Sequence, residues 1–353
     1  MIRGRFIVLA PLVLACSCFL FNVTSMKASD YATIKRGDGA GQISYKIDEF
    51  GLEDLTCKIF IHDDKICLVD NIQGRIQVVE PDGDIQLILG SLNGITGHEK
   101  VSRKFNFSTI GALFMDEDGN LFVQNIISQS AGSRYTERSG GEFSPSYVLV
   151  FNKSGMLQYA LGQNGSTSTP FSQIDSIEVD SEGRLIVISR TFDAWNVYSF
   201  KGKNLNYHIN LAKLDFNEKE GDNVYTGKIE NVKMYSSGDK FLISADYYDG
   251  LRLKYRKVFV FSVKQNRIEK TLMTIPDPKN VLFTMVDDKL IYFWNIDRDV
   301  RFSVYNHEGN IVSNIKLDLN SRRNYYTRII EDRKGDIYSY HINKEGIQVL
   351  EWE

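Results

Sequence analysis

Residues 112–123 read ALFMDEDGNLFV, and residues 176–187 read SIEVDSEGRLIV. Each stretch consists of an apolar run, an acidic turn with a glycine, and a second apolar run, which is typical of two short antiparallel strands. Weaker copies lie at residues 59–69, 232–244, 281–293 and 329–340, and a third and a fourth apolar segment follow most copies. Short strands at regular spacing, with no helical period, predict an all-β repeat protein.

Six units of four strands predict a six-bladed β-propeller. The sixth unit stops after its third strand, at Trp352-Glu353, whereas residues 38–47 resemble a fourth strand without a unit of its own. We therefore expect Gln42–Asp48 to pair with Ile347–Trp352, so that N-terminal and C-terminal strands close the ring and hide its edges. Residues 41–353 are expected to form a single propeller domain.

The composition is that of a folded, nearly neutral protein. The chain has 353 residues, of which 42% are hydrophobic, and 42 Lys and Arg stand against 45 Asp and Glu. A net charge of -3 argues against a nucleic-acid-binding protein, because such proteins carry a strongly basic surface.

The first 25 residues are interpreted as an export segment, and residues 26–40 as a linker. Arg3 and Arg5 precede the apolar run Phe6–Ala15, which ends in Ala15-Cys16. This pattern leaves three alternatives open: a lipoprotein signal with Cys16 as the lipidated residue, ordinary cleavage after Ser25, or an uncleaved anchor. All three predict an exported protein, periplasmic or at the cell surface, which a lipid on Cys16 would attach to a membrane.

Cys57 and Cys67 are the two cysteines beyond the export segment. They flank a predicted hairpin turn, so an oxidising compartment would permit a disulfide between them. The alternative is that both are small buried apolar residues.

Residues 69–83, VDNIQGRIQVVEPDG, resemble the repeat of NHL-type six-bladed propellers. Residues 159–163 together with Pro170-Phe171 are similar to the junction between two such repeats. The resemblance is strong in the first three units, whereas units four to six lack the Val-Asp pair and the second unit has a long insert, Gln124–Ser146. The resemblance implies a propeller like those of exported bacterial envelope proteins, including spirochaete lipoproteins, and implies little about activity.

Motifs for catalysis or cofactors are not found in the sequence. None of the five histidines stands at a metal-ligand spacing, and no serine-hydrolase elbow or phosphate-binding loop is present. Acidic Gly-containing stretches such as residues 116–119 are interpreted as turns rather than calcium loops. We therefore expect no metal and no cofactor.

A binding surface is predicted on the face that carries the loops between second and third strands and between fourth and first strands. These loops are rich in Arg and aromatic residues, which are common at binding hot spots. The alternative is that many of these rings pack within their own loops or between blades. The set comprises Arg134, Tyr135, Arg138, Arg190, Phe192, Trp195, Tyr247, Tyr248, Arg252, Tyr255, Trp294, Arg298, Arg322, Arg323, Tyr325 and Tyr326.

A second candidate site is the mouth of the central channel. Alignment of the six first strands places Asp175, Glu230 and Lys279 at one level and Arg328 at the next. Such a ring of charges suits either a small-molecule site or a water-filled channel with mutually satisfied charges.

Two functions follow from these features. The first is a non-catalytic binding or scaffolding propeller of the bacterial cell envelope, which recognises a protein or a glycan through the loop face and the insert beside it. The second is an extracytoplasmic lyase or hydrolase, in which Asp175 or Glu230 would act as an acid or base.

Overall fold

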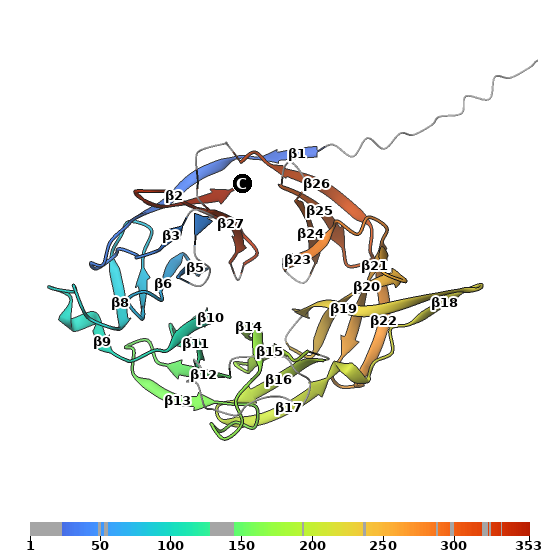
Figure 1. The fold of residues 1–353 in the computed structure, drawn as a ribbon, viewed down its shortest axis with the longest axis horizontal. Coiled ribbons are helices and arrows are strands. Elements are labelled where there is room, and N and C mark those ends of the chain that lie inside the picture. The colour runs from blue at the N-terminus through green and yellow to red at the C-terminus, as the bar shows by residue number, and fades with distance from the viewer. Residues whose placement is uncertain are drawn as a thin grey trace, which may run out of the picture.

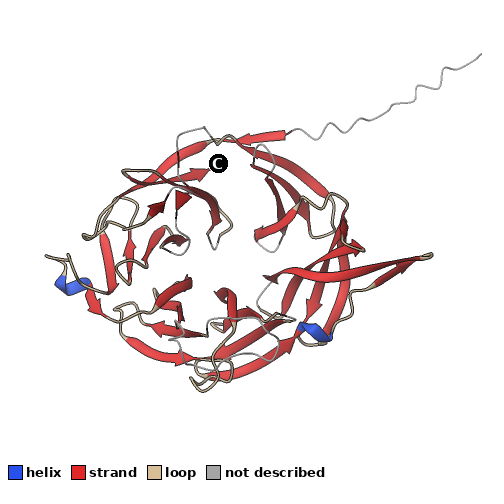
Figure 2. Cartoon of the chain, viewed as in Figure 1, coloured by secondary structure: helices blue, strands red, loops and turns tan. Residues whose placement is uncertain are grey.

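The computed structural model describes residues 23–48, 51–52, 56–127, 145–192, 194–235, 238–286, 289–296, 300–319, 324, 326–332 and 334–353. Six antiparallel sheets stand around a central axis as the blades of a propeller, each with its first strand innermost (Figure 1). The expected all-β, six-bladed fold is confirmed, and strands make up nearly all of its regular structure (Figure 2).

Every blade has four main strands, and three blades add one more. In chain order the blades are β5(Cys57–His62)–β6(Lys65–Asp70)–β7(Arg75–Val79)–β8(Ile85–Gly90), with β9(Ser102–Lys104) parallel to β8; β10(Thr109–Met115)–β11(Leu121–Ile126)–β12(Ser146–Phe151)–β13(Leu157–Leu161); β14(Gln173–Val179)–β15(Leu185–Arg190)–β16(Trp195–Lys201)–β17(Asn204–Asn210); β19(Asn223–Tyr235)–β20(Lys240–Asp249)–β21(Arg252–Ser262)–β22(Arg267–Ile275), with β18(Glu218–Glu220) against β19; β23(Val281–Val286)–β24(Leu290–Ile296)–β25(Val300–Asn306)–β26(Ile311–Leu317), with β1(Val23–Met26) parallel to β26; and β27(Tyr326–Glu331)–β28(Ile337–Ile342)–β29(Gly346–Trp352)–β2(Ala28–Lys35). A two-residue hairpin, β3(Ile47–Asp48) and β4(Gly51–Leu52), and two short 3-10 helices, η1(Glu99–Val101) and η2(Leu211–Lys213), complete the described elements.

The middle strands of each blade form the core because neighbouring blades cover both of their faces. In β15, for example, the run Leu185–Ile188 is fully buried rather than alternating between buried and exposed residues. Strands covered on both sides are expected to be continuously apolar in this way. Within the described ranges, no helix is long and apolar enough to cross a bilayer.

The ring is closed by an N-terminal strand, but the expected segment was wrong. β29 pairs with β2, in the register Ala28↔Trp352 to Lys35↔Gly346, and not with Gln42–Asp48. β2 therefore occupies residues that were expected to be a linker. Its sequence, ASDYATIK, has few large aliphatic side chains and does not resemble the fourth strands of the other units.

Residues 38–45 fold over the junction of the first and last blades instead. Ile43 and Tyr45 alternate as in a strand, yet they are buried in the core that these two blades share. The Ser44 N–H donates to the Asp70 carboxylate over 2.8 Å, and the guanidinium of Arg75 donates to the Asp38 carbonyl over 2.6 Å. A buried Asp and a buried Arg, paired across β6 and β7, thus hold the N-terminal segment in place.

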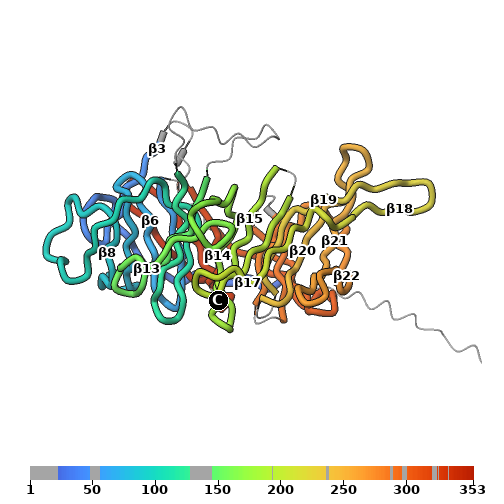
Figure 3. Tube along the Cα trace, turned by 90° about the horizontal axis from the view of Figure 1, so that it is seen from below, coloured from blue at the N-terminus to red at the C-terminus, as the bar shows by residue number. Residues whose placement is uncertain are grey.

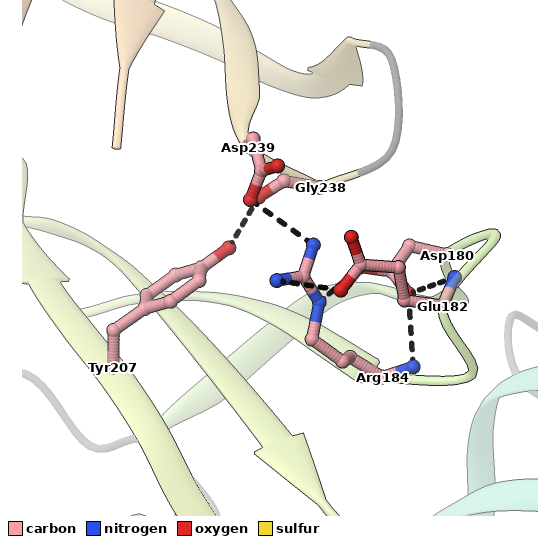
Figure 4. Close-up of polar contacts among 6 residues, drawn as sticks. All are labelled: Asp180, Glu182, Arg184, Tyr207, Gly238 and Asp239. Carbon is pink, nitrogen blue, oxygen red and sulfur yellow. Dashed lines mark hydrogen bonds and ion pairs between the residues drawn. The ribbon is translucent and has the colours of Figure 1, made fainter. Parts of the chain in front are cut away.

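A polar contact joins the third and fourth blades at the turns between their first and second strands (Figure 4). Arg184 Nε lies 2.7 Å from Asp180 Oδ2, and its Nη2 lies 3.1 Å from Asp239 Oδ1 in the next blade. The Tyr207 hydroxyl donates to the Gly238 carbonyl over 2.6 Å. A Cβ at Gly238 would lie 2.5 Å from Asp180 Oδ2, so this close approach requires glycine.

Cys57 and Cys67 are both free and buried. In the β5–β6 register Cys57 lies opposite Asp70 and Cys67 opposite Phe60, so the two cysteines are not paired across the hairpin. Burial raises the pKa of each thiol to about 12, which keeps both protonated and unreactive. The alternative of two small buried apolar residues is the one that the structure shows.

Candidate functional site

The inner strands of four blades carry a register shift at the same height. It lies between Ile110 and Leu113 in β10, and at the corresponding points of β14, β19 and β23. A β-bulge of this kind leaves one residue unpaired and turns its side chain out of the regular ladder. Asp175 and Glu230 are the bulged residues of β14 and β19.

Lys279 does not belong to this level, and its alignment with Asp175 was wrong. The bulged residue of β23 is Phe283, whereas Lys279 precedes the strand and is exposed. Residues 277–280 form a turn, in which the Asn280 N–H donates to the Asp277 carbonyl over 3.1 Å, so the strand begins after this turn and the sequence alignment started the unit four residues too early.

The six inner strands enclose a cavity of about 1130 Å³ on the propeller axis. Asp175 and Arg328 line it, as expected, whereas Glu230 is not among the lining residues. Charges of the fourth blade (Arg256) and of the third blade (Asp175 and Arg190) influence the pKa of Glu230, so its carboxyl group lies near the boundary of these two blades. One of its oxygens is buried without a hydrogen-bond partner among the described residues.

A charged cluster within the cavity was missed by the sequence alignment. It consists of Glu178 on β14, Lys233 on β19 and Glu331 on β27, which we call the charged cluster. Lys233 Nζ lies 3.4 Å from Glu331 Oε1, and both side chains are partly exposed, to 28% and 26%. Each of these residues stands three positions after an aligned residue, namely Asp175, Glu230 and Arg328. The alignment ended before it reached them, and following the same inner strands further would have pointed to them.

Burial and charge act on this cluster in opposite directions. Burial raises the pKa of Glu178, and Lys233 partly offsets the effect. Burial by itself would lower the pKa of Lys233, but neighbouring carboxylates outweigh it and the pKa is raised. Those carboxylates belong to Glu331, Glu178 and Asp175. Lys233 therefore stays charged, because charge pairing compensates for its desolvation.

Burial and neighbouring charges also have opposite effects on the pKa values of Asp175 and Glu230. Burial is the main cause that raises the pKa of Asp175, and Arg190 and Lys233 act against it. The pKa of Glu230 is also raised by burial, which Arg256 partly offsets. Arg190 Nε lies 3.8 Å from Asp175 Oδ1, and the charges of both residues also influence the pKa of Glu230. Three of the predicted site residues therefore lie near one another.

Two aromatic residues of the predicted binding set, Trp195 and Tyr247, pack inside the blades. Trp195 is 9% exposed, its indole N–H donates to the Ile229 carbonyl over 3.3 Å, and the Arg190 guanidinium lies over its ring. Tyr247 is buried, and its ring stacks on that of Tyr255 with the centroids 4.9 Å apart. These rings therefore stabilise the packing of the third and fourth blades, which was the alternative to a binding role.

Trp294 differs from them because it lines the cavity and packs against Phe283. Tyr326 lies near Tyr340, which also lines the cavity. Seven members of the predicted binding set lie outside the described residues: Arg134, Tyr135, Arg138, Arg298, Arg322, Arg323 and Tyr325. Cys16 and most of the insert also lie outside them.

The loop face instead presents single apolar side chains at its hairpin tips. Phe192, between β15 and β16, is 73% exposed, and Leu251, between β20 and β21, is 100% exposed. Ile72 and Ile127 occupy the same connection in the first two blades and are also exposed. Figure 3 shows the β18 arm and the extended strands of the fourth blade rising on one side of the ring, with the C-terminus on the other side.

The fourth blade has an Asp–Arg pair that is not evident in its sequence. Asp246 Oδ1 accepts from Arg256 Nε over 2.6 Å in a buried contact across β20 and β21. Asp70 and Arg75 occupy the same place in the first blade. The long β20–β21 hairpin separates the two residues in sequence and so conceals the motif.

Within the part of the chain that the structure describes, no three His, Cys, Asp or Glu side chains form a group that could hold a metal ion.

No family model matches the sequence, and no curated protein matches it. Among solved structures, the chain is similar to a protein of unknown function from Bacteroides caccae, with 12% identity and a TM-score of 0.40, over 75% of this chain and 83% of that one. It is also similar to the Dos1 propeller, with 11% identity and a TM-score of 0.42, over 88% of this chain and 82% of that one. Likenesses this distant do not indicate an activity. The propeller observed in this chain fits a ligand-binding or scaffolding role.

Proposed function

We propose that the chain is a non-catalytic binding propeller of the bacterial envelope, of the NHL type, which recognises a protein partner through its loop face. Exposed apolar side chains on the connections between second and third strands of four consecutive blades carry this proposal. Exposed large apolar side chains that recur from blade to blade on one face suit contact with a protein partner. A glycan is less suited, because Trp195 and Tyr247 are buried and cannot offer a stacking surface.

A pull-down from envelope extract tests the loop face. We expect the double variant Phe192→Ser/Leu251→Ser to lose the partner that the wild type retains, because both contact side chains are removed. The matched control is Met156→Ser/Leu157→Ser, which removes two exposed apolar residues from the opposite face. Equal retention by both variants, or binding to purified glycans that neither variant affects, would contradict the proposal.

We also propose that Cys16 is lipidated and that the mature chain starts there. β1 supports this choice, because Val23–Ser25 pair with Asn314–Lys316 of the fifth blade. Cleavage after Ser25 would remove three of the four residues of β1. Since β1 runs parallel to β26, towards the loop face, the chain enters from the opposite side, and a lipid anchor would leave the loop face directed away from the membrane.

Radiolabelled palmitate is expected to enter the wild type and to be absent from Cys16→Ala. Mass spectrometry of the mature protein should find Cys16 at the N-terminus. A mature terminus at Met26 would instead show ordinary signal cleavage, and β1 would then be dispensable.

One observation favours the enzyme as a second candidate. Burial raises the pKa of both Asp175 and Glu230, which is what an acid catalyst requires. However, Arg190 and Lys233 act against the shift at Asp175, and Glu230 does not line the cavity. Hydrolysis of chromogenic glycosides or esters by the wild type, abolished in Asp175→Asn, would place the enzyme first.

A further inference from the structure

The outer strands of the blades share a bulge close to their first residues. In the first four blades the bulged residue is exposed and polar: Gln86, Gln158, Asn206 and Glu269. In the sixth blade it is Tyr31, whose ring packs on that of Tyr338. In β26 of the fifth blade it is Val312, which is 49% exposed. Because a bulge turns a side chain out of the regular ladder, the fifth blade presents an apolar group where the first four present a polar one.

Two further exposed apolar side chains lie beside Val312. Ile311 directly precedes it, and Val23 of β1 is 55% exposed. Val23 lies opposite Asn314, two residues along β26 from Val312, and Figure 1 shows β1 on the outer rim of the ring beside β26. Val23, Ile311 and Val312, which we call the rim patch, therefore stand together where the chain enters the propeller.

Basic side chains predominate around the rim patch. The β25–β26 turn packs on the outer strand of the fourth blade, since a Cβ at Gly309 would lie 2.7 Å from the Leu272 carbonyl oxygen. The segments that meet here, residues 23–27, 263–275 and 306–318, contain five basic residues and three acidic ones: Lys27, Lys264, Arg267, Lys270 and Lys316 against Glu269, Glu308 and Asp318. One of these acids, Glu269, is paired over 2.8 Å with Lys240, which lies outside these segments. The region around the rim patch therefore has a net positive charge.

The proposed lipid on Cys16 lies close to this patch. Seven residue steps separate Cys16 from Val23. A fully extended chain covers at most about 3.6 Å per residue, so the lipidated residue lies within about 25 Å of β1. A propeller anchored in this way keeps the outer rim of its fifth blade next to the membrane.

We infer that the rim patch and the basic side chains around it rest on a membrane surface that contains anionic lipid. The apolar side chains would enter the boundary between headgroups and acyl chains, and the lysines would contact headgroup phosphates. Three apolar side chains are too few to hold the protein on a bilayer, so the inference rests on the proposed lipidation of Cys16. The contact would fix the orientation of the anchored propeller and leave its loop face free for a partner.

Fluorescence quenching tests this contact in the lipidated full-length protein. An NBD fluorophore is attached through Val312→Cys in a Cys18→Ser background, in which Cys57 and Cys67 are buried and unreactive. The matched control is Asn206→Cys, the bulged residue of the third blade. In vesicles of phosphatidylcholine and phosphatidylglycerol that carry a nitroxide on some acyl chains, we expect quenching at position 312 to be at least about twofold stronger than at position 206. Equal quenching at the two positions would overturn the inference.

Lysine variants test the need for anionic lipid. Lys264→Gln/Lys270→Gln should weaken the quenching at position 312 when phosphatidylglycerol is present and leave it unchanged in phosphatidylcholine alone. Lys201→Gln/Lys203→Gln, which removes two exposed lysines from a turn of the third blade, should have no effect in either lipid. Quenching that does not depend on phosphatidylglycerol, or equal effects of the two pairs, would contradict a role for anionic lipid.

Incorporation of radiolabelled palmitate, measured in the same samples, separates this inference from the lipidation that it rests on. A protein that carries palmitate and floats with the vesicles, yet shows no excess quenching at position 312, overturns the contact while the lipidation stands. A protein without palmitate overturns both. A concentration-dependent blue shift of the label at position 312 in detergent, without vesicles, would instead assign the rim patch to contact with a second copy of the chain.

Discussion

A chain without residues 1–35 is expected not to fold, whereas a chain without residues 1–22 should unfold at the same temperature as the full-length protein. The longer deletion removes β1 and β2, which cover the outer edges of the last two blades. It removes the whole strand that pairs with β29, including the buried Ile34, and it exposes the buried side chain of Trp352 to water. The shorter deletion leaves every described strand intact.

The size of this effect follows from the marginal stability of proteins. Each lost ladder hydrogen bond costs roughly 1 kcal/mol, and a buried aliphatic side chain such as Ile34 contributes roughly 2 kcal/mol. Over the eight residues of β2 these losses approach the whole stability of a typical domain, about 5–15 kcal/mol. Circular dichroism and thermal melting of the two chains provide the measurement. If the chain without residues 1–35 shows a cooperative transition within a few degrees of that of the full-length protein, the role of β2 is refuted.

Replacement of Arg75 by Met is expected to lower the free energy of unfolding by about 3–5 kcal/mol, the loss that is typical when one of two buried, oppositely charged neighbours is removed. Arg75 has no exposed surface, and it donates to the carbonyls of Asp38 and Asn93, over 2.6 and 3.2 Å. Burial lowers the pKa of its guanidinium, and Asp70 and Asp38 oppose that effect. Without the guanidinium, the Asp70 carboxylate remains buried with less compensation, and the N-terminal segment loses its attachment to the first blade.

Urea denaturation followed by tryptophan fluorescence measures the difference. The control is Arg267→Met, at an exposed site, which should change the free energy of unfolding by less than about 0.5 kcal/mol. Similar losses in both variants would mean that the contacts of Arg75 do not anchor the N-terminal segment to the first blade.

Local pattern alone was sufficient to predict the blades. The phrases at residues 112–123 and 176–187 match β10–β11 and β14–β15, because a turn rich in Asp and Gly between two apolar runs has few other solutions. The weaker copies also form the first two strands of their blades. The same local information predicted that one N-terminal strand would complete the last blade.

The choice of that strand depended on long-range contacts. Residues 42–48 have the better alternating pattern, but Ile43 and Tyr45 are buried between two blades. The more polar segment Ala28–Lys35 pairs with β29 instead. Backbone hydrogen bonds stabilise an outer strand whatever its side chains, so hydrophobicity is a poor guide to it.

In the candidate site, too, the sequence predicted some features and long-range contacts decided others. Asp175 and Arg328 could be placed at the channel from the repeat, because inner strands of a propeller all face the axis. The fifth unit, however, begins four residues later than its sequence suggested, so Phe283 stands in the position assigned to Lys279. A long hairpin concealed the pair of Asp246 and Arg256. The sequence thus determined the repeat, the number of blades and the strand order, since these rest on local turns and apolar runs. Only the tertiary structure decided which side chains share the cavity, because register and packing between blades depend on contacts between residues that are distant in the chain.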